Sequence, residues 1–184
     1  MFIQTENTPN PDALKFLPGQ EITATPMHFA SQEESLGCIL VAQLFDIKGV
    51  QSVFFGQDFI TITKDTNLEW QVLKPFILAT IIDHLSLGLS PLQGLNEQKP
   101  QYDEQNLSSI EKQIIEIIET RVRPSVAMDG GDITYRGFED GIVYLELKGS
   151  CSGCPSASIT LKNGIESMLQ YYVPEVKAVE AINE

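Results

Sequence analysis

The sequence predicts an α+β fold in which two small α/β-layer domains are joined by a flexible linker. Two segments carry alternating extended and helical apolar patterns, and the segment between them has no sustained periodicity. This middle segment, residues 88–106, contains two prolines, two glycines and several amide side chains, which is typical of a linker. We therefore expect an N-terminal domain over residues 1–87 and a C-terminal domain over residues 107–184.

The N-terminal domain is expected to order its elements as two strands, a helix, a hairpin and a second helix. Two prolines within residues 8–12 fix a rigid turn between the first two strands. A capping box formed by Thr66 and Glu69 is expected to open the second helix, which contains Pro75. The expected strands are residues 2–5, 13–17, 50–55 and 59–63, and the expected first helix is residues 35–47.

The C-terminal domain is expected to begin with a helix, followed by a hairpin, a second helix and a last strand. Ser108 and Glu111 form a capping box at the start of the first helix, which is expected to end at Pro124. Asp140 and Gly141 suit a tight turn that needs positive φ. The expected strands are residues 133–138, 142–148 and 175–181, and alternation in the second of them predicts one buried face. Arg121 and Arg123 are expected to complement the dipole at the end of the first helix.

The sequence Cys151-Ser152-Gly153-Cys154-Pro155 lies between the second of these strands and the last helix. Two thiols at this spacing can bind a metal ion or an iron–sulfur cluster, or can form a reversible disulfide. Pro155 suits a first helical position, so the N-terminus of the helix should favour the thiolate form of both cysteines. We expect this loop to lie outside the hydrophobic core.

The number of available ligands bears on the kind of site. A zinc ion or a [4Fe–4S] cluster takes four ligands, and one CxxC pair supplies two. Cys38 is expected as a small buried residue in the other domain. His28 and His84 have no ligand spacing, and His84, near a helix end, is expected to be a surface residue or a partner of the helix dipole. The simplest tetrathiolate site therefore takes Cys151 and Cys154 from each of two chains.

Two other interpretations of the cysteine pair remain open. A CxxC at a helix N-terminus also occurs in thioredoxin-like thiol–disulfide oxidoreductases, where the motif follows the first strand of a βαβ unit. In this sequence a helix and a hairpin precede the motif, which argues against that fold. A structural zinc site would need a second ligand pair.

Asp129-Gly130-Gly131-Asp132 precedes the hairpin of the C-terminal domain. Paired carboxylates can bind a divalent ion or act as acid and base. A glycine turn whose aspartates bond to local backbone is the favoured interpretation. The sequence contains no conventional enzyme active site, so we expect a protein that is not an enzyme.

Composition limits the partners and the location. The net charge of −13 argues against binding to nucleic acid or to an anionic membrane. The longest apolar run, Phe76–Ile82, is too short to span a bilayer. The N-terminus carries Glu6 and Asp12 and no early arginine, so it resembles neither a signal peptide nor a transit peptide. We expect a cytoplasmic protein or the mature form of a mitochondrial matrix protein.

Several separated motifs, in order, closely resemble the NifU C-terminal (Nfu) domain between about Leu107 and Val179. These motifs are Arg123-Pro124, Met128-Asp129-Gly130-Gly131-Asp132-Ile133, the residues 149–156 around the cysteine pair, and Thr160-Leu161-Lys162. The N-terminal part of the chain resembles the Nfu N-terminal domain. The residues that carry this second resemblance are Gln4-Thr5-Glu6, Thr8-Pro9-Asn10-Pro11, Ala13-Leu14-Lys15-Phe16 and Pro18-Gly19.

The resemblance implies an iron–sulfur cluster scaffold or carrier. Members of this family hold a [4Fe–4S] cluster between two subunits through the CxxC of each, and deliver it to apo-proteins. This implies Cys151 and Cys154 as the cluster ligands, with a [2Fe–2S] cluster as the other form. The implied partners are a second copy of the chain in a homodimer, upstream assembly proteins and apo iron–sulfur client proteins.

Overall fold

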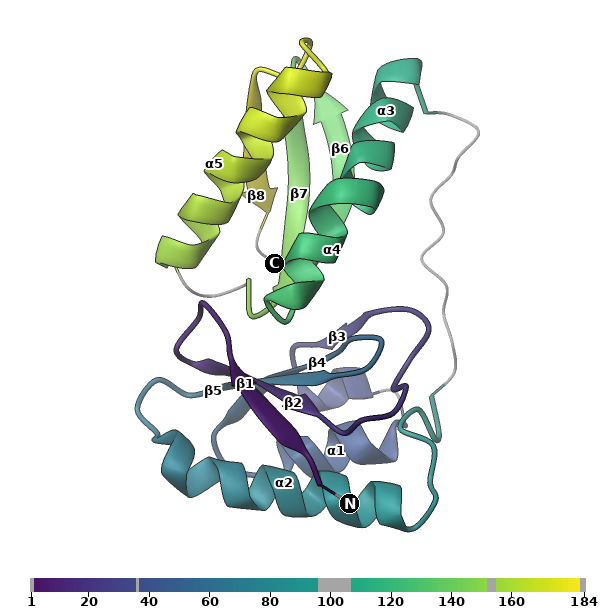
Figure 1. Ribbon diagram of the computed structural model, residues 1–184, viewed down its shortest axis with the longest axis vertical. Helices are drawn as coiled ribbons and strands as arrows, with labels where there is room; N and C mark the ends of the chain where they lie inside the picture. The colour runs from purple at the N-terminus through teal and green to yellow at the C-terminus, as the bar shows by residue number, and fades with distance from the viewer. Residues whose placement is uncertain (1, 36, 96–106, 152–154, 183–184) are drawn as a thin grey trace. The chain divides into compact units, whose positions relative to one another are not determined.

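The computed structural model describes residues 2–35, 37–95, 107–151 and 155–182, with the backbone alone for residues 155–158. The chain forms two compact units, Met1–Glu97 and Gln98–Glu184. Each unit contains one sheet and its own helices (Figure 1), which confirms the predicted α+β class. Much of the expected linker, residues 96–106, lies outside the described residues.

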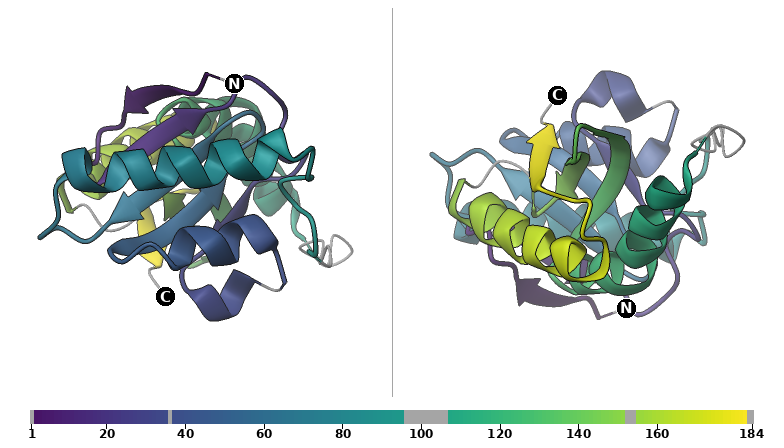
Figure 2. Two further views of the ribbon diagram at one scale, coloured as in Figure 1. Left: turned by 90° about the horizontal axis from the view of Figure 1, so that it is seen from below. Right: turned by 90° about the horizontal axis from the view of Figure 1, so that it is seen from above.

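The first unit is an antiparallel five-stranded sheet with the strand order β1-β2-β5-β4-β3. Its strands are β1 (Gln4–Asn7), β2 (Ala13–Leu17), β3 (Met27–Phe29), β4 (Val50–Phe55) and β5 (Ile60–Lys64). Helices α1 (Ile39–Phe45) and α2 (Trp70–Ser86) lie on the same face of this sheet (Figures 1 and 2). The fully buried side chains of this core include Phe16, Leu40, Leu44, Phe55, Ile60, Ile62, Ile77 and Ile81.

Four predicted strands of the first unit are confirmed to within two residues at each end. The edge strand β3 was not predicted, because three residues are too few to show an alternating pattern. β3 pairs with β4 through contacts such as Phe29 with Val53. The rings of Phe29 and Phe55 also meet edge to face, with their centroids 5.6 Å apart.

The helix predicted over residues 35–47 is shorter in the structure. A 3₁₀ turn, η1 (Gln32–Ser35), is followed by α1, which begins only at Ile39. Gly37 lies between them with a φ of +87°. This conformation is incompatible with a right-handed helix, so the helical pattern is interrupted there.

The capping box predicted at Thr66 and Glu69 is wrong. α2 begins at Trp70, so Glu69 is itself the N-cap residue, and its side chain makes no capping hydrogen bond. The preceding residues form a turn instead, in which the Asn67 N–H donates to Asp65 Oδ1 at 2.8 Å. Asp, Asn and Thr are common both in turns and at helix N-caps, and in this segment they form a turn.

Residues 88–95, the first part of the expected linker, pack against the first unit. The Ile39 N–H at the start of α1 donates to the Gln93 carbonyl oxygen at 3.2 Å. Leu92 and Leu95 pack against the hydrophobic core. These contacts attach the segment after α2 to the beginning of α1.

The second unit is a three-stranded sheet with the order β6-β7-β8. β6 (Gly131–Glu139) pairs antiparallel with β7 (Ile142–Gly149), and β8 (Ala178–Ile182) pairs parallel with β7. Helix α5 (Pro155–Tyr172) connects the two parallel strands, so β7, α5 and β8 form a βαβ unit. Helices α3 (Ser109–Ile117), α4 (Arg123–Met128) and α5 lie on one face of the sheet (Figures 1 and 2). The predicted burial of one face of β7 is confirmed, because Val143, Leu145 and Leu147 are buried.

The turn of the β6–β7 hairpin is confirmed. Asp140 has a φ of +53° and Gly141 a φ of +89°. Two consecutive positive φ values define a type I′ turn, whose twist matches that of the flanking strands. Asp140 is the only residue other than glycine with positive φ in the described part of the chain.

The first helix of the second unit begins as predicted but continues past its predicted end. The Ser108 N–H donates to Glu111 Oε2 at 2.8 Å, and the Glu111 N–H donates to Ser108 Oγ at 3.3 Å, which confirms the capping box. The stop predicted at Pro124 is wrong. A π-helical segment, η3 (Ile118–Val122), joins α3 to α4, so Pro124 falls in the first turn of α4, where proline is tolerated. No helix in the described ranges combines the length and the apolar character needed to cross a membrane.

We predict that Ser108→Ala lowers the stability of the second unit by about 1 kcal/mol, because it removes the capping acceptor of the Glu111 N–H. Denaturant unfolding followed by the near-UV circular dichroism of tyrosine reports on this unit, since all five tyrosines lie at or beyond residue 102. Ser109→Ala, at the exposed first helical position, is the matched control and should change little. Equal losses in both variants would contradict the capping assignment.

Candidate functional site

Cys151 lies between the end of β7 and the start of α5. β7 ends at Gly149, whose φ of +67° turns the chain out of the strand, and α5 begins at Pro155. The predicted order of strand, cysteine motif and helix is therefore confirmed. Cys154 lies outside the described residues, so the structure locates the first thiol of the pair.

Cys151 belongs to the core of the second unit, so the expectation that the loop lies outside the core is wrong for Cys151, the one residue of the cysteine pair that the structure describes. Its side chain is 7% exposed, and it belongs to the buried cluster that contains Ile133, Leu147 and Ile165. A protonated thiol behaves as a small apolar side chain. The loop is therefore anchored at Cys151 by the same burial that forms the core.

The environment of Cys151 opposes ionisation of its thiol. Burial raises the pKa of Cys151 to about 11; the hydrogen bond with Ser150 lowers it, and the negative charges of Asp129 and Asp132 raise it further. The Ser150 Oγ and Cys151 Sγ atoms are 3.9 Å apart. The expectation that the helix N-terminus makes Cys151 a thiolate is therefore wrong for this state, because the loss of hydration outweighs other effects.

Gly131, the first residue of β6, packs directly against the thiol of Cys151. A Cβ added at Gly131 would lie 2.6 Å from Cys151 Sγ and 2.7 Å from the Lys148 carbonyl oxygen. Gly131 also faces Gly149 in the β6–β7 register. Only glycine allows β6 to approach the cysteine loop this closely.

Ser150 joins the cysteine loop to the turn that precedes β6. Its N–H donates to the Gly130 carbonyl oxygen at 3.3 Å, and its hydroxyl donates to the Asp129 carbonyl oxygen. Gly130 has a φ of +82°, which agrees with the predicted glycine turn. Through these two hydrogen bonds, Ser150 fixes the turn at Asp129 and Gly130 next to Cys151.

The side chain of Asp132 bonds to an arginine rather than to local backbone. Asp132 is 5% exposed, and its Oδ1 accepts a hydrogen bond from Arg123 Nε at 2.8 Å. Within the described residues, no group of three or more His, Cys, Asp or Glu side chains is arranged to hold a metal ion. Asp132 therefore acts through its ion pair with Arg123, and Asp129 through the hydrogen bond that its backbone carbonyl oxygen accepts from Ser150.

Arg123 holds the helical layer against β6. Besides its bond to Asp132, its Nη2 donates to the Ile133 carbonyl oxygen at 3.2 Å, and its Nη1 pairs with Glu119 one turn earlier. Arg123 was expected to complement the end of a helix. Because the helix continues into α4, Arg123 instead connects the helix to the strand whose first residue contacts Cys151.

The other cysteine and the histidines lie in the first unit. Cys38 is fully buried as expected, its Sγ donates to the Pro91 carbonyl oxygen at 3.2 Å, and burial raises its pKa. His84 is 2% exposed, so the expected surface position is wrong, but it lies in the last turn of α2, the position of the other alternative, a partner of the helix dipole. His28 is partly buried in the edge strand β3. Cys38 is therefore a core residue, as its interpretation from sequence predicted.

Sequence reasoning named Gly131 and Arg123 as parts of motifs but missed the contacts through which they shape this site. Most turns need only one glycine. The second glycine of the Gly130–Gly131 pair was therefore the sequence signal that Gly131 has another role. The signal for Arg123 was weaker, since the pattern does not show that Asp132 is its partner. Both contacts join segments that are not adjacent in sequence.

Two family models match the chain. The model described as "Scaffold protein Nfu/NifU N terminal" matches residues 3–88, and the model described as "NifU-like domain" matches residues 114–180. Together the two matches cover parts of both units of the structure.

Curated relatives align over nearly the whole chain. The human protein named "NFU1 iron-sulfur cluster scaffold homolog, mitochondrial" is 50% identical over 184 residues, which cover 99% of this chain and 72% of that protein. The protein of the same name from Drosophila ananassae is 46% identical and aligns with 99% of this chain and 64% of its own length. The chain thus spans about two thirds of the length of these relatives.

Among solved structures, the solution structure of a NifU-like protein from Saccharomyces cerevisiae matches part of the chain. The match covers 50% of this chain and 85% of the yeast chain, at 32% identity and a TM-score of 0.46.

We predict that Gly131→Ala destabilises the second unit by roughly 1–3 kcal/mol, because the new Cβ would overlap Cys151 Sγ and force β6 or the cysteine loop to move. Denaturant unfolding followed by tyrosine circular dichroism measures the change. Gly137→Ala in the same strand is the matched control, since no atom lies within 4 Å of a Cβ added there. A Gly131 variant as stable as the Gly137 variant would show that the contact does not restrict the strand.

We also predict slow alkylation of Cys151 in the folded apo-protein. Its pKa is raised from 9.0 to about 11, so at pH 8 the fraction of thiolate, and with it the rate, should fall roughly a hundredfold below that in the urea-unfolded chain. The same shift stabilises the fold below about pH 9, and this contribution is lost as the pH rises towards 11.

Mass spectrometry of the Cys151 peptide, in a Cys154→Ser background that removes the neighbouring thiol, gives the rate of alkylation at each pH. The rate should climb up to about pH 11. Equal rates at pH 8 in the folded and unfolded chains would mean that Cys151 is an exposed, ordinary thiol.

Proposed function

Because the chain belongs to the NifU/Nfu family of iron–sulfur cluster scaffold proteins, we propose that it binds an iron–sulfur cluster as cargo and transfers it to apo-proteins. The observation that carries this proposal is the position of Cys151 at the junction of β7 and α5, in a loop bounded by Gly149 and Pro155. In this proposal Cys151 and Cys154 are the cluster ligands, and the cluster is [4Fe–4S].

The number of thiols supports a cluster shared by two chains. A [4Fe–4S] cluster takes four cysteine ligands, and each chain offers the pair of Cys151 and Cys154. Cys38 is unsuited as a further ligand, because it is fully buried in the core of the first unit. A homodimer in which each chain supplies its pair across a two-fold axis completes the ligand set.

Exposed apolar side chains near the cysteine loop support the same dimer. Met128, at the end of α4, is 77% exposed, and Ile159, in the second turn of α5, is 59% exposed. α4 ends one residue before Asp129, whose carbonyl accepts the Ser150 hydroxyl, and α5 begins just after the cysteine motif. A second chain that approaches the cluster would cover these side chains, and such burial favours association.

The burial of Cys151 suits a carrier that must release its cargo. Ligation needs a thiolate, so cluster binding removes the proton of Cys151 and draws its sulfur out of the core. The positive charge of the iron supplies the driving force for that ionisation. When the cluster leaves, the thiol regains its proton and returns to the core. Burial in the apo-protein therefore competes with the cluster and lowers its net affinity.

The thiol–disulfide oxidoreductase remains the second candidate, and one observation favours it. The motif lies after the first strand of the βαβ unit formed by β7, α5 and β8, which is the position that the alternative requires. The raised pKa of Cys151 opposes it, because the attacking cysteine of such enzymes is a thiolate at neutral pH. The carrier function fits the acid–base behaviour of Cys151 better.

The proposed partners are apo iron–sulfur proteins that receive the cluster, assembly proteins that supply it, and a second copy of the chain. The net charge of −13 favours partners with basic surfaces and opposes binding to nucleic acid. The names of the curated relatives place those proteins in mitochondria, and this supports the mitochondrial matrix as the location.

Anaerobic reconstitution with iron and sulfide tests the ligand assignment. The wild-type protein should take up about two irons and two sulfides per chain, which is one cubane cluster for each pair of chains. Cys151→Ser and Cys154→Ser should each abolish uptake, because each removes two of the four ligands of a symmetric site. Cys38→Ser is the control and should retain full uptake.

Circular dichroism of the tyrosines must show that each variant is folded, because Cys151 is part of the core. A folded Cys151 or Cys154 variant with full iron content would reject that residue as a ligand. A wild-type protein that takes up no iron but reduces disulfide substrates would favour the oxidoreductase.

A further inference from the structure

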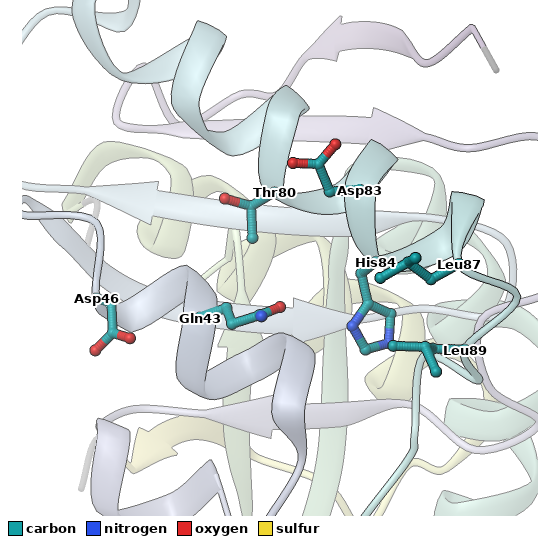
Figure 3. Close-up of a pocket in the computed structure, with 7 residues that line it drawn as sticks. All are labelled: Gln43, Asp46, Thr80, Asp83, His84, Leu87 and Leu89. Atoms are coloured by element: carbon teal, nitrogen blue, oxygen red, sulfur yellow. The ribbon is translucent and has the colours of Figure 1, made fainter.

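A pocket of about 300 Å³ opens between α1 and α2 of the first unit (Figure 3). Gln43 and Asp46 line it from α1 and its C-cap, and Thr80, Asp83 and His84 line it from α2. The volume is at the lower end of the range for small-ligand sites. All of these residues belong to the first unit, whereas the cysteine motif belongs to the second.

His84 presents a buried nitrogen to which no described residue offers a hydrogen bond. The side chain is 2% exposed, and its Nε2 lies 3.0 Å from the Ser90 carbonyl oxygen. A carbonyl can only accept, so Nε2 carries the proton and, in the neutral ring, Nδ1 is an acceptor. Nδ1 is buried and has no hydrogen-bond partner among the described residues. Buried polar atoms are normally paired, so a ligand that donates a hydrogen bond to Nδ1 would complete this site.

Two carboxylates give the pocket a negative charge. Asp83 makes no ion pair in the described part of the chain, and Asp46 accepts one hydrogen bond from Gln32 Nε2 at 2.9 Å. Among the residues that the structure describes, no lysine or arginine lines the pocket. Figure 3 shows Asp83 on α2 with its carboxylate turned away from the imidazole, and Asp46 farther off, beyond Gln43, so the two carboxylates are not gathered around one point. A ligand for this site must therefore donate hydrogen bonds and carry positive charge, while a metal ion would lack a ligand set.

We propose that this pocket binds the guanidinium group of an arginine side chain presented by a partner protein. A guanidinium has five N–H donors in a planar fork, so one N–H can donate to Nδ1 of His84 while the positive charge is attracted by the carboxylates that line the pocket. The methylene groups of the arginine would lie along Leu87 and Leu89, which complete the pocket wall. The net charge of −13 favours such a basic partner. This inference rests on the proposed function in one respect, because a cluster carrier must bind the proteins that supply or receive the cluster.

Nitrogen-15 NMR of the full chain labelled only at histidine tests the site directly, because the chain has two histidines, His28 and His84. The probe is the capped peptide acetyl-Gly-Arg-Gly-amide. It should shift the ring-nitrogen signals of His84 in a saturable way and leave those of His28 unchanged. The same peptide with citrulline in place of arginine keeps the shape and loses the charge, and it should produce no saturable shift.

Asp83→Asn should raise the Kd of the arginine peptide about two- to fivefold, the range that one exposed ion pair supplies. Asp58→Asn is the matched control, since it removes the same charge from the β4–β5 turn, which does not line the pocket. Iron uptake measured on the same Asp83 variant should remain at the wild-type level. Weaker peptide binding with normal iron uptake in this variant thus separates this site from the cluster site.

Three outcomes would overturn the proposal. One is the absence of any His84 shift with the arginine peptide. Another is equal binding of the citrulline peptide, which would remove the role of charge. The third is tighter binding of free L-arginine than of the capped peptide, which would replace the protein partner by a small molecule. Failure of wild-type iron uptake would contradict the proposed function and leave these NMR results unaffected.

Discussion

The close packing of Gly131 against Cys151 is the constraint on which the second unit depends. It requires β6 and β7 to pair in the register that sets Gly131 opposite Gly149, and it leaves no room for a side chain at the first residue of β6. Ser150 fixes the preceding turn to the same loop, and Arg123 fixes β6 to the helical layer. The strand ends, the turn and the helix are thus all positioned around one sulfur atom.

This packing connects the fold to the proposed transfer of a cluster. In the proposed function, the sulfur of Cys151 has two competing environments, the apolar core in which it is a protonated thiol and the cluster to which it would bind as a thiolate. A ligand held rigidly in the open would bind its cluster more strongly. When the cluster is released, the burial of the ligand in the core contributes favourable free energy to the release. In this proposal, the same contact stabilises the apo-fold and would weaken the binding of the cluster.

Local patterns in the sequence predicted most of the fold, and the errors occur where distant residues decide. The Ser108 capping box and the Asp140–Gly141 turn depend on neighbouring residues and are confirmed. The end predicted at Pro124 failed because a π segment before it starts a new helical turn, which the apolar pattern does not show. The order of strand, cysteine motif and helix was predictable. The burial of Cys151 and of His84 was not, since each depends on tertiary packing.

Native mass spectrometry of the anaerobically loaded protein tests the central claim most directly. The account predicts one dominant iron-containing species whose mass equals two chains plus a single cluster of about four irons and four sulfides, and apo-protein at the mass of one chain. A cluster retained by a single chain would contradict the shared site formed by Cys151 and Cys154. A dimer of unchanged abundance with and without iron would show that the cluster does not join the chains.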